Sequence, residues 1–323
     1  MDFSIVIATY NGAQRLPKVL ELLKTQVLTQ KIQWEILVID NNSQDNTAQV
    51  VSNYAQKWHE GSQLRYIFEP KQGAAYARCR GVKEAKTTSL IGFLDDDNLP
   101  PANWVTEAYT FGRDRPEVGA YGGIIHAKLD TPRPPYFNQV KGYLTIYNRG
   151  GQAFQYKRDA KPRRIPPAPG AVIRKEVWQQ TIPSPEKLLI GGRDAKTMAA
   201  GEDAEMMFYI QNSDWEVWHN PKMEVWHHIP PYRLEKSYLL KLARGYGLSN
   251  YLTRLARYKP WQRPLIRLIT PLYTIRDSVK LLKYYWQYKN ILEDDFGKAC
   301  ELEVKIGQFY SPYLWLYSFL YSH

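Results

Sequence analysis

Residues 89–98 read Ser-Leu-Ile-Gly-Phe-Leu-Asp-Asp-Asp-Asn, an apolar run that ends in three consecutive carboxylates. The apolar part has the length of a buried strand. Adjacent carboxylates repel one another, and a turn or cap that keeps them solvated is the simpler use of such a run. A divalent cation removes the repulsion, because Mg2+ or Mn2+ binds one or two carboxylates together with substrate phosphate oxygens. Asp95 and Asp97 project to the same side of an extended backbone, so this stretch predicts a metal or nucleotide site.

The chain around this run alternates strands with helices. The pattern predicts strands at residues 4–9, 34–40 and 65–68 and helices at residues 17–25, 47–57 and 73–85. Such an order is typical of an α/β fold, a Rossmann-like and mostly parallel sheet flanked by helices. Ligands bind at the carboxyl ends of the strands in such sheets. We therefore expect three polar strand ends to meet in one crevice: residues 8–11, 40–42 and 95–98.

The pattern changes twice further along the chain. Alternation becomes looser after residue 115, and from about residue 234 the periodicity is helical. We expect a catalytic domain followed by a basic and aromatic helical extension. The predicted bounds are 1–232 for the catalytic domain, with a nucleotide-binding half at about 1–115 and an acceptor half at about 116–232, and 233–323 for the extension.

The net charge of +11 is concentrated in this extension. Residues 233–289 carry 13 Lys and Arg against two acids, so the remaining residues are neutral as a set. Apolar and aromatic residues alternate with these cations, and we expect Ile266, Ile269, Tyr273 and Leu282 to share a face. Basic amphipathic helices rest on anionic membrane surfaces, which predicts such a partner. The alternative is a set of helices packed on the catalytic domain with a solvated basic face.

The sequence also bears on location. No stretch reaches the ~20 apolar residues of a spanning helix, and Met1 leads into the first strand without a leader pattern. Cys79 and Cys300 have no metal-ligand spacing, and two distant cysteines are typical of a reducing compartment. We expect a cytoplasmic protein that is peripheral at the inner face of the plasma membrane.

Two polar positions flank the first helices. Asp40 ends the second strand, where a carboxylate accepts hydrogen bonds from a base or a ribose hydroxyl; a turn with the asparagines that follow is the alternative. Gly73 lets the backbone approach a ligand before the third helix, and Arg78 in that helix has the geometry to clamp phosphate. A solvated helical arginine is the alternative for Arg78.

Later positions offer acid–base and ligand chemistry. Glu202 and Asp203 stand at the start of a helix predicted over residues 203–211. Acids there stabilise the helix dipole, or one of them accepts the proton of an acceptor hydroxyl. His227 is either an additional metal ligand or a strand-edge histidine bonded to backbone.

Taken together, these segments resemble the family 2 glycosyltransferases, which share the A-type nucleotide-sugar transferase fold. The matching stretches are residues 4–12, 35–47, 73–81, 93–98 and 201–205. A narrower likeness is to bacterial, including cyanobacterial, members that act in exopolysaccharide biosynthesis. The resemblance implies an inverting transfer, dependent on Mn2+ or Mg2+, of a sugar from a nucleotide-diphosphate donor. It implies a UDP-sugar as donor and a hydroxyl of a saccharide or lipid-linked saccharide as acceptor.

The resemblance assigns a role to each matching position. Ala8, Tyr10 and Asn11 would line the nucleotide pocket, with Asp40 at the base and Gly73 and Arg78 near the ribose or diphosphate. Asp97 and Asp95 would bind the metal with His227 as a third ligand, Asp96 would contact ribose, and Gly122 and Gly123 would edge the donor-sugar pocket. Asp203 would be the general base, with Glu202 beside it. The family usually has Asn after this arginine, and Cys79 stands there instead, so only Arg78 is carried over.

Two other classes of protein remain open. A nucleotidyltransferase has a similar sheet and a carboxylate-held metal, but it should carry a Gly-rich basic signature near residues 8–15, which is absent. A non-catalytic binding module would rest on the basic extension alone and would leave the acidic run unexplained. No nucleic-acid-binding motif accompanies the charge, so we expect no nucleic-acid partner.

Overall fold

The computed structural model describes residues 1–58, 61–190, 198 and 201–321. The chain forms two compact units. The first contains residues 1–128, 146–188 and 206–228, and the second contains residues 129–145, 189–205 and 229–323. Residues 129–145 and 189–205 thus interrupt the first unit in sequence and belong to the second unit. The domain boundary expected at residue 232 stays a prediction.

The first unit is built on a mixed, mostly parallel sheet. Its strands are β1 (Phe3–Thr9), β2 (Trp34–Asp40), β3 (Ser62–Phe68), β4 (Leu90–Asp95), β5 (Asn98–Leu99), β6 (Val118–Leu129), β7 (Phe154–Gln155), β8 (Val172–Arg174) and β9 (Glu216–Ile229). Their order is β3-β2-β1-β4-β8-β6-β9-β5, with β7 paired to β9. The strands β1 to β4 are mutually parallel, whereas β8 runs antiparallel to β4 and β6. The predicted α/β class is confirmed.

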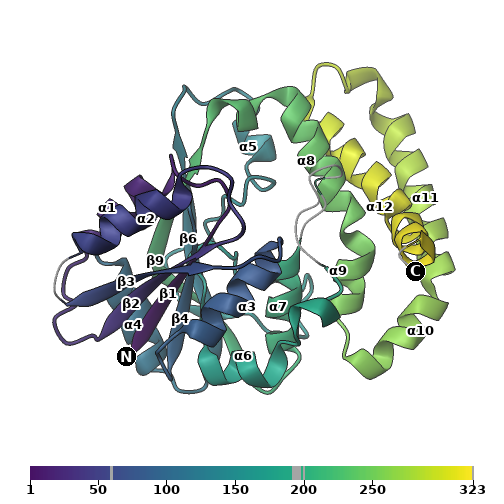
Figure 1. The fold of residues 1–323 in the computed structure, drawn as a ribbon. Helices are drawn as coiled ribbons and strands as arrows, with labels where there is room; N and C mark the ends of the chain where they lie inside the picture. The colour runs from purple at the N-terminus through teal and green to yellow at the C-terminus, as the bar shows by residue number, and fades with distance from the viewer. Residues whose placement is uncertain (59–60, 191–197, 199–200, 322–323) are drawn as a thin grey trace. The chain divides into compact units, whose positions relative to one another are not determined.

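Helices cover both faces of this sheet (Figure 1). The helices of the first unit include α1 (Leu16–Lys24), α2 (Thr47–Gln56), α3 (Ala74–Glu84), α4 (Trp104–Arg113) and α6 (Lys175–Thr181). Successive side chains of a strand point to opposite faces, so Ile5 and Ile7 of β1 pack in a core with α1 and α4. Val6 between them packs in a second core with α3 and α6. The apolar runs of β1, β2 and β4 are therefore buried on both faces, as expected for a parallel sheet flanked by helices.

The second unit is helical. Its elements include α5 (Phe137–Val140), the start of α7 (Glu202–Gln211), α8 (Lys236–Leu248), α9 (Asn250–Ala256), α10 (Arg263–Leu268), α11 (Thr270–Tyr288) and α12 (Phe296–Tyr321). Helix α12 packs along α8 and also contacts α9 and α11. The helical extension expected after residue 234 is confirmed. Within the part of the chain that the structure describes, no helix has the length and apolarity to cross a bilayer.

The prediction that Ile266, Ile269, Tyr273 and Leu282 share one face of α10 and α11 is wrong. Ile266 is buried with Tyr251 and Leu255 in a small core of the second unit, and Ile269 packs against that core. Leu282 is 58% exposed. The predicted set combined residues from the buried side and from the exposed side of the helices. A helical period of 3.6 residues allows several choices of apolar face, and only packing selects one of them.

Candidate active site

The carboxyl ends of three strands lie next to one another in the first unit. Thr9 at the end of β1 is paired with Asp40 at the end of β2, and Ala8 is paired with Asp95 at the end of β4. The loops that follow these strands therefore start from one edge of the sheet. This confirms the expected convergence of the polar strand ends.

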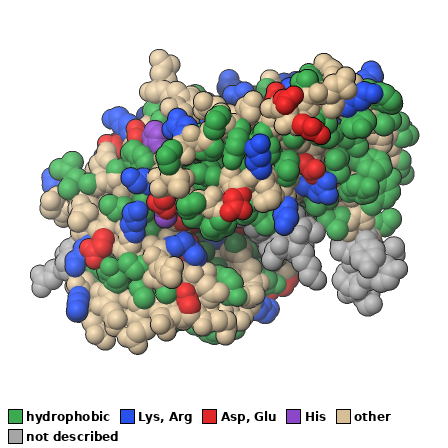
Figure 2. Space-filling view, turned by 90° about the horizontal axis from the view of Figure 1, so that it is seen from above, with side chains coloured by type: hydrophobic (Ala, Val, Ile, Leu, Met, Phe, Trp, Pro, Cys, Tyr) green, Lys and Arg blue, Asp and Glu red, His purple; other side chains and the backbone are tan. Residues whose placement is uncertain are grey.

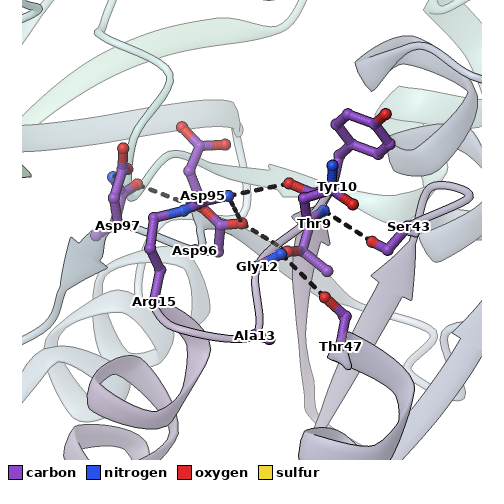
Figure 3. Close-up of polar contacts among 12 residues, drawn as sticks. Thr9, Tyr10, Gly12, Ala13, Arg15, Ser43, Thr47, Asp95, Asp96 and Asp97 are labelled. Carbon is purple, nitrogen blue, oxygen red and sulfur yellow. Dashed lines mark hydrogen bonds and ion pairs between the residues drawn. The ribbon is translucent and has the colours of Figure 1, made fainter. Parts of the chain in front are cut away.

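The middle carboxylate of the acidic run is bound within the fold (Figure 3). Arg15 donates from Nε and Nη2 to the two oxygens of Asp96, each at 2.8 Å. Thr9 Oγ1 donates to the same carboxylate at 2.5 Å. The Asp96 side chain is only 10% exposed. These three donors engage both Asp96 oxygens, while the ribose contact implied for Asp96 stays a prediction.

The other two carboxylates of the run take different directions. Strand β4 ends at Asp95, and the next two residues form a turn into β5, so the extended-backbone argument for Asp95 and Asp97 does not hold. The Asn98 side chain stabilises this turn by accepting from the Asp95 N–H at 2.9 Å and donating to Asp97 Oδ1 at 2.9 Å. Antiparallel pairing of β5 with β9 puts Asn98 opposite His227.

Pairing of β5 with β9 brings an imidazole to the acidic run. His227 Nε2 lies 3.4 Å from Asp97 Oδ2, and both side chains are 11% exposed. The Asp97 carbonyl accepts the His228 N–H at 2.9 Å. Two of the predicted metal ligands, Asp97 and His227, are thus adjacent. Among the described residues no group of three or more His, Cys, Asp or Glu side chains forms a ready metal cage.

Asp95 carries an electrostatic cost. Removal from water raises the pKa of Asp95 above its ordinary value, the Arg78 guanidinium opposes this, and the carboxylates of Asp97 and Asp96 raise the pKa further. Arg78 Nη2 lies 3.3 Å from Asp95 Oδ1, and its side chain is 9% exposed. Arg78 is therefore a buried cation at the sheet edge and not the solvated helical arginine of the alternative interpretation.

The loop after β1 is fixed by the loop after β2 (Figure 3). Asn11 adopts a left-handed backbone, with φ of 49°; its N–H donates to Ser43 Oγ and its side chain accepts from the Gln44 N–H, each at 2.8 Å. The Gly12 N–H donates to Thr47 Oγ1 at 2.9 Å. A Cβ at Gly12 would lie 2.0 Å from Thr9 Oγ1. Tyr10 is 47% exposed, so it projects from a loop that is itself held in place.

Asp40 is engaged locally. Its Oδ1 accepts from the Ser43 N–H at 2.9 Å, and its Oδ2 accepts from the Tyr66 hydroxyl at 2.8 Å. The first contact is the turn that the sequence offered as the alternative for this residue. Tyr66 was not foreseen, because its place beside Asp40 follows from the pairing of β2 with β3. The base contact implied for Asp40 stays a prediction.

Asn41 organises the loop before α3. Its amide nitrogen donates to the Lys71 carbonyl at 2.6 Å, and its carbonyl oxygen accepts from the Gly73 N–H at 2.7 Å. Gly73 has φ of 134°, a left-handed region that favours glycine. The predicted approach of backbone at Gly73 thus has a matching conformation, and Asn41, which the sequence did not single out for this contact, holds it.

Gly122 and Gly123 lie within β6 and are crowded by protein. A Cβ at Gly123 would lie 1.7 Å from the Met223 carbonyl oxygen, and one at Gly122 would lie 2.9 Å from Pro166 Cβ. Glycine is therefore needed at these positions for packing. The sugar-pocket role implied for the pair stays a prediction.

The acids at the start of α7 belong to the second unit. Helix α7 begins at Glu202, whose Oε2 accepts from the Gly201 N–H at 3.2 Å. Glu205 is fully buried, and its two oxygens accept the N–H groups of Leu189 and Ile190, each at 2.8 Å. Asp203 is half-buried in the first turn of α7. Of the three acids, Glu205 has an evident structural use, and the general-base role of Asp203 stays a prediction.

The parallel half-sheet, the acidic turn after β4 and the antiparallel β8 and β9 define the A-type fold of nucleotide-sugar transferases. A mannosyltransferase of Pyrobaculum calidifontis, solved with GDP-Man and Mn2+, has this fold with a TM-score of 0.59, 16% identity and coverage of 96% of this chain and 87% of that chain. Staphylococcus aureus TarS 1–349, solved with UDP, has a TM-score of 0.52, 13% identity and coverage of 95% and 92%.

Sequence comparison gives the family. Residues 4–181 match the family described as Glycosyl transferase family 2, which is more than half of the chain, and the protein belongs to this family. Glycosyltransferase AglE of Haloferax volcanii is 23% identical over 190 residues, which are 58% of each protein. An uncharacterized glycosyltransferase of Escherichia coli, YibD, is 31% identical over 104 residues, 32% of this chain and 28% of that protein. The chain thus matches little more than half the length of AglE.

Proposed function

We propose that this protein transfers a sugar from a nucleotide-diphosphate sugar to a hydroxyl of a saccharide or lipid-linked acceptor in polysaccharide biosynthesis, with inversion at the anomeric carbon. The observation that carries the proposal is the strand-end cluster of Asp95, Asp97, His227 and Arg78 on a family 2 fold. Structures with this fold contain UDP, UDP-GlcNAc or GDP-Man. A UDP-sugar is the donor that we propose.

Asp97 and His227 are adjacent donors for a divalent cation, and we propose Asp95 from the same turn as the third ligand. Asp95 and Asp97 would supply carboxylate oxygens and His227 an imidazole nitrogen. Removal from water raises the pKa of Asp95, and the carboxylates of Asp97 and Asp96 raise it further; a cation would compensate the charge of these carboxylates. Mn2+ accepts such a mixed set, and both Mn2+ and Mg2+ complete their coordination with water and substrate phosphates. The ligands proposed here would leave coordination positions for the phosphates of a nucleotide diphosphate. The bound cation would neutralise charge on the departing diphosphate.

The remaining steps are assigned to residues of the chain. Asn11 and Gly12 would position the nucleotide, and Arg78 would hold negative charge at the diphosphate. Asp203 would accept the proton of the acceptor hydroxyl as its oxygen bonds to the anomeric carbon. The bond from that carbon to the diphosphate oxygen breaks on the opposite face, and its electron pair leaves with the nucleotide diphosphate. One displacement inverts the anomeric configuration.

Release of nucleotide diphosphate from a panel of nucleotide sugars, with and without Mn2+, tests the proposal. Asp97→Asn should abolish metal-dependent release, while Asp114→Asn, which changes an exposed carboxylate after α4, should not. Asp203→Asn should retain nucleotide binding and lose transfer. Full activity of D97N would remove Asp97 from the metal site, and release of inorganic diphosphate in place of the nucleotide diphosphate would favour a nucleotidyltransferase.

The proposal includes attachment of the second unit to the inner, anionic membrane surface. Eight exposed apolar side chains recur at intervals of three and four residues and form what we call the α10–α11 stripe: Trp261, Leu265, Leu268, Leu272, Ile275, Val279, Leu282 and Trp286, with exposed fractions of 45% to 76%. Figure 2 shows hydrophobic side chains gathered in the second unit with lysine and arginine beside them.

The charges beside the α10–α11 stripe favour a membrane over a second copy of the chain. Arg276 and Lys283 border the stripe and are exposed, whereas the one acid of α11, Asp277, is buried. Pairing two copies along the stripe would bring these cations together without a compensating acid. An anionic lipid surface attracts each of them by about 1 kcal/mol.

Sedimentation with phosphatidylserine vesicles tests the attachment. Leu272→Glu should weaken sedimentation, since Leu272 is 68% exposed within the stripe. Leu28→Glu is the matched control, because Leu28 is 67% exposed in the first unit. Equal binding of L272E and the unchanged protein would refute the attachment. A dimer in solution that L272E dissociates would assign the stripe to self-association instead.

A further inference from the structure

A polar cavity of about 300 Å³ lies in the second unit among α9, α11 and α12. Its volume is at the lower end of the range of small-molecule sites, about 300–1,000 Å³. It is lined by Asn250, Thr253, Arg254, Arg257, Tyr258, Tyr273, Arg276, Asp277, Lys280 and Gln308. Among these described residues three arginines and one lysine carry positive charge and Asp277 carries negative charge, around a space large enough for a small anion.

Two of these cations are held in fixed positions. The guanidinium groups of Arg254 and Arg276 lie 4.2 Å and 4.9 Å from the centre of the Tyr273 ring. Asp277 accepts from Arg254 at 3.0 Å and from Arg276 at 2.6 Å. The Arg254 and Asp277 side chains are only 14% and 8% exposed, whereas that of Arg276 is 46% exposed. Arg254 and Asp277 thus form a buried ion pair in the cavity wall, and Arg276 lies at its exposed edge.

The fixed guanidinium groups keep donors for a further acceptor. A guanidinium has five N–H donors. Asn250 and Asp277 engage Nη2 of Arg254, and Asp277 engages Nε and Nη2 of Arg276. Among the described residues, Nη1 of each guanidinium has no acceptor. The planar fork of arginine matches the oxygens of phosphate. A phosphate dianion or a diphosphate brings more negative charge to these two guanidinium groups than a single carboxylate ligand would.

The other two cations add to the same field. Removal from water and the neighbouring charge of Arg254 lower the pKa of Arg257, and Tyr258 opposes this. Lys280 is exposed on α11, one turn after Arg276, where its ammonium group has access to the mouth of the cavity. An anion between these groups would relieve their mutual repulsion.

We infer that this cavity binds a phosphate or diphosphate group. The inference does not depend on the proposed sugar transfer, since no residue of the acidic run takes part. Helix α11 carries both the cavity wall and part of the α10–α11 stripe, so the phosphate has two possible sources, a lipid headgroup and a soluble phosphate compound.

Calorimetric titration of the full chain with inorganic diphosphate tests the site. EDTA in the buffer suppresses metal-dependent binding of diphosphate elsewhere. Arg257→Gln and Lys280→Gln should each weaken binding at least tenfold. Lys283→Gln is the matched control, because Lys283 is exposed on the same helix and does not line the cavity; its affinity should stay within twofold. No binding at millimolar diphosphate, or equal weakening by K280Q and K283Q, would overturn the inference.

Vesicles separate the two sources of phosphate. Phosphatidylcholine vesicles are doped with phosphatidic acid or with phosphatidylserine at equal surface charge. A preference for phosphatidic acid that K280Q removes and K283Q keeps would assign the cavity to a lipid headgroup. Diphosphate binding in solution without any such preference would assign it to a soluble phosphate compound.

Discussion

Arg15→Met tests whether the middle carboxylate of the acidic run is neutralised within the fold. Methionine keeps the apolar stem of Arg15 and removes both 2.8 Å contacts with Asp96. Loss of one partner of a buried ion pair costs about 3–5 kcal/mol, and an exposed pair is worth about 0–1 kcal/mol. The Arg15 side chain is 40% exposed and that of Asp96 is 10% exposed, and Thr9 still donates to Asp96. We therefore expect R15M to lower the free energy of unfolding by about 2 kcal/mol.

Urea unfolding of R15M beside R113M measures this effect. Arg113 contacts Asp114 at the same 2.8 Å, but the two side chains are 55% and 48% exposed. Solvent screens that pair, so R113M should leave the unfolding midpoint unchanged. Adding Asp96→Asn to R15M should restore part of the loss, because the uncompensated charge is removed. If R15M and R113M had the same effect, the carboxylate of Asp96 would not depend on Arg15, and our account of the acidic run would be refuted.

Three further predictions concern the loop after β1, the two cysteines and the buried acid Glu205. Gly12→Ala should weaken nucleotide binding at least tenfold in a calorimetric titration, because the Cβ of the alanine would lie 2.0 Å from Thr9 Oγ1 and displace the loop. Unchanged nucleotide affinity would show that this loop does not contact nucleotide. Burial raises the pKa of Cys79 to about 11 and that of Cys300 to about 12. Iodoacetamide should therefore label the folded chain at pH 8 at least tenfold more slowly than the unfolded chain, with a labelling rate that rises towards pH 10. Equal labelling rates would contradict the burial of the two thiols. Glu205→Gln replaces one of the two carboxylate oxygens of Glu205, each of which accepts a backbone N–H. It should lower the free energy of unfolding by about 1.5–3 kcal/mol. Unchanged urea unfolding would show that these hydrogen bonds contribute little to stability.

The local pattern of the sequence determined the framework of the first unit. The apolar runs at β1, β2 and β4 predicted their strands to within one residue at each end, and helix α1 begins one residue before the predicted start. Such runs are read correctly because strands buried on both faces need apolar side chains throughout. The convergence of Asp40 and Asp95 followed from parallel order alone, since parallel strands end at one edge of a sheet.

Only the tertiary structure decided how the acidic run is used. Asp96 is bound by Arg15, and Asp97 lies beside His227, which is 130 positions away in the sequence and arrives through the pairing of β5 with β9. A two-residue strand such as β5 has too little periodicity to be predicted, and an arginine shows no partner in its own sequence. Likewise the α10–α11 stripe and the anion cavity depend on which side of each helix is packed. Periodicity gives the spacing of apolar residues, but contact with α9 and α12 selects the side that is buried.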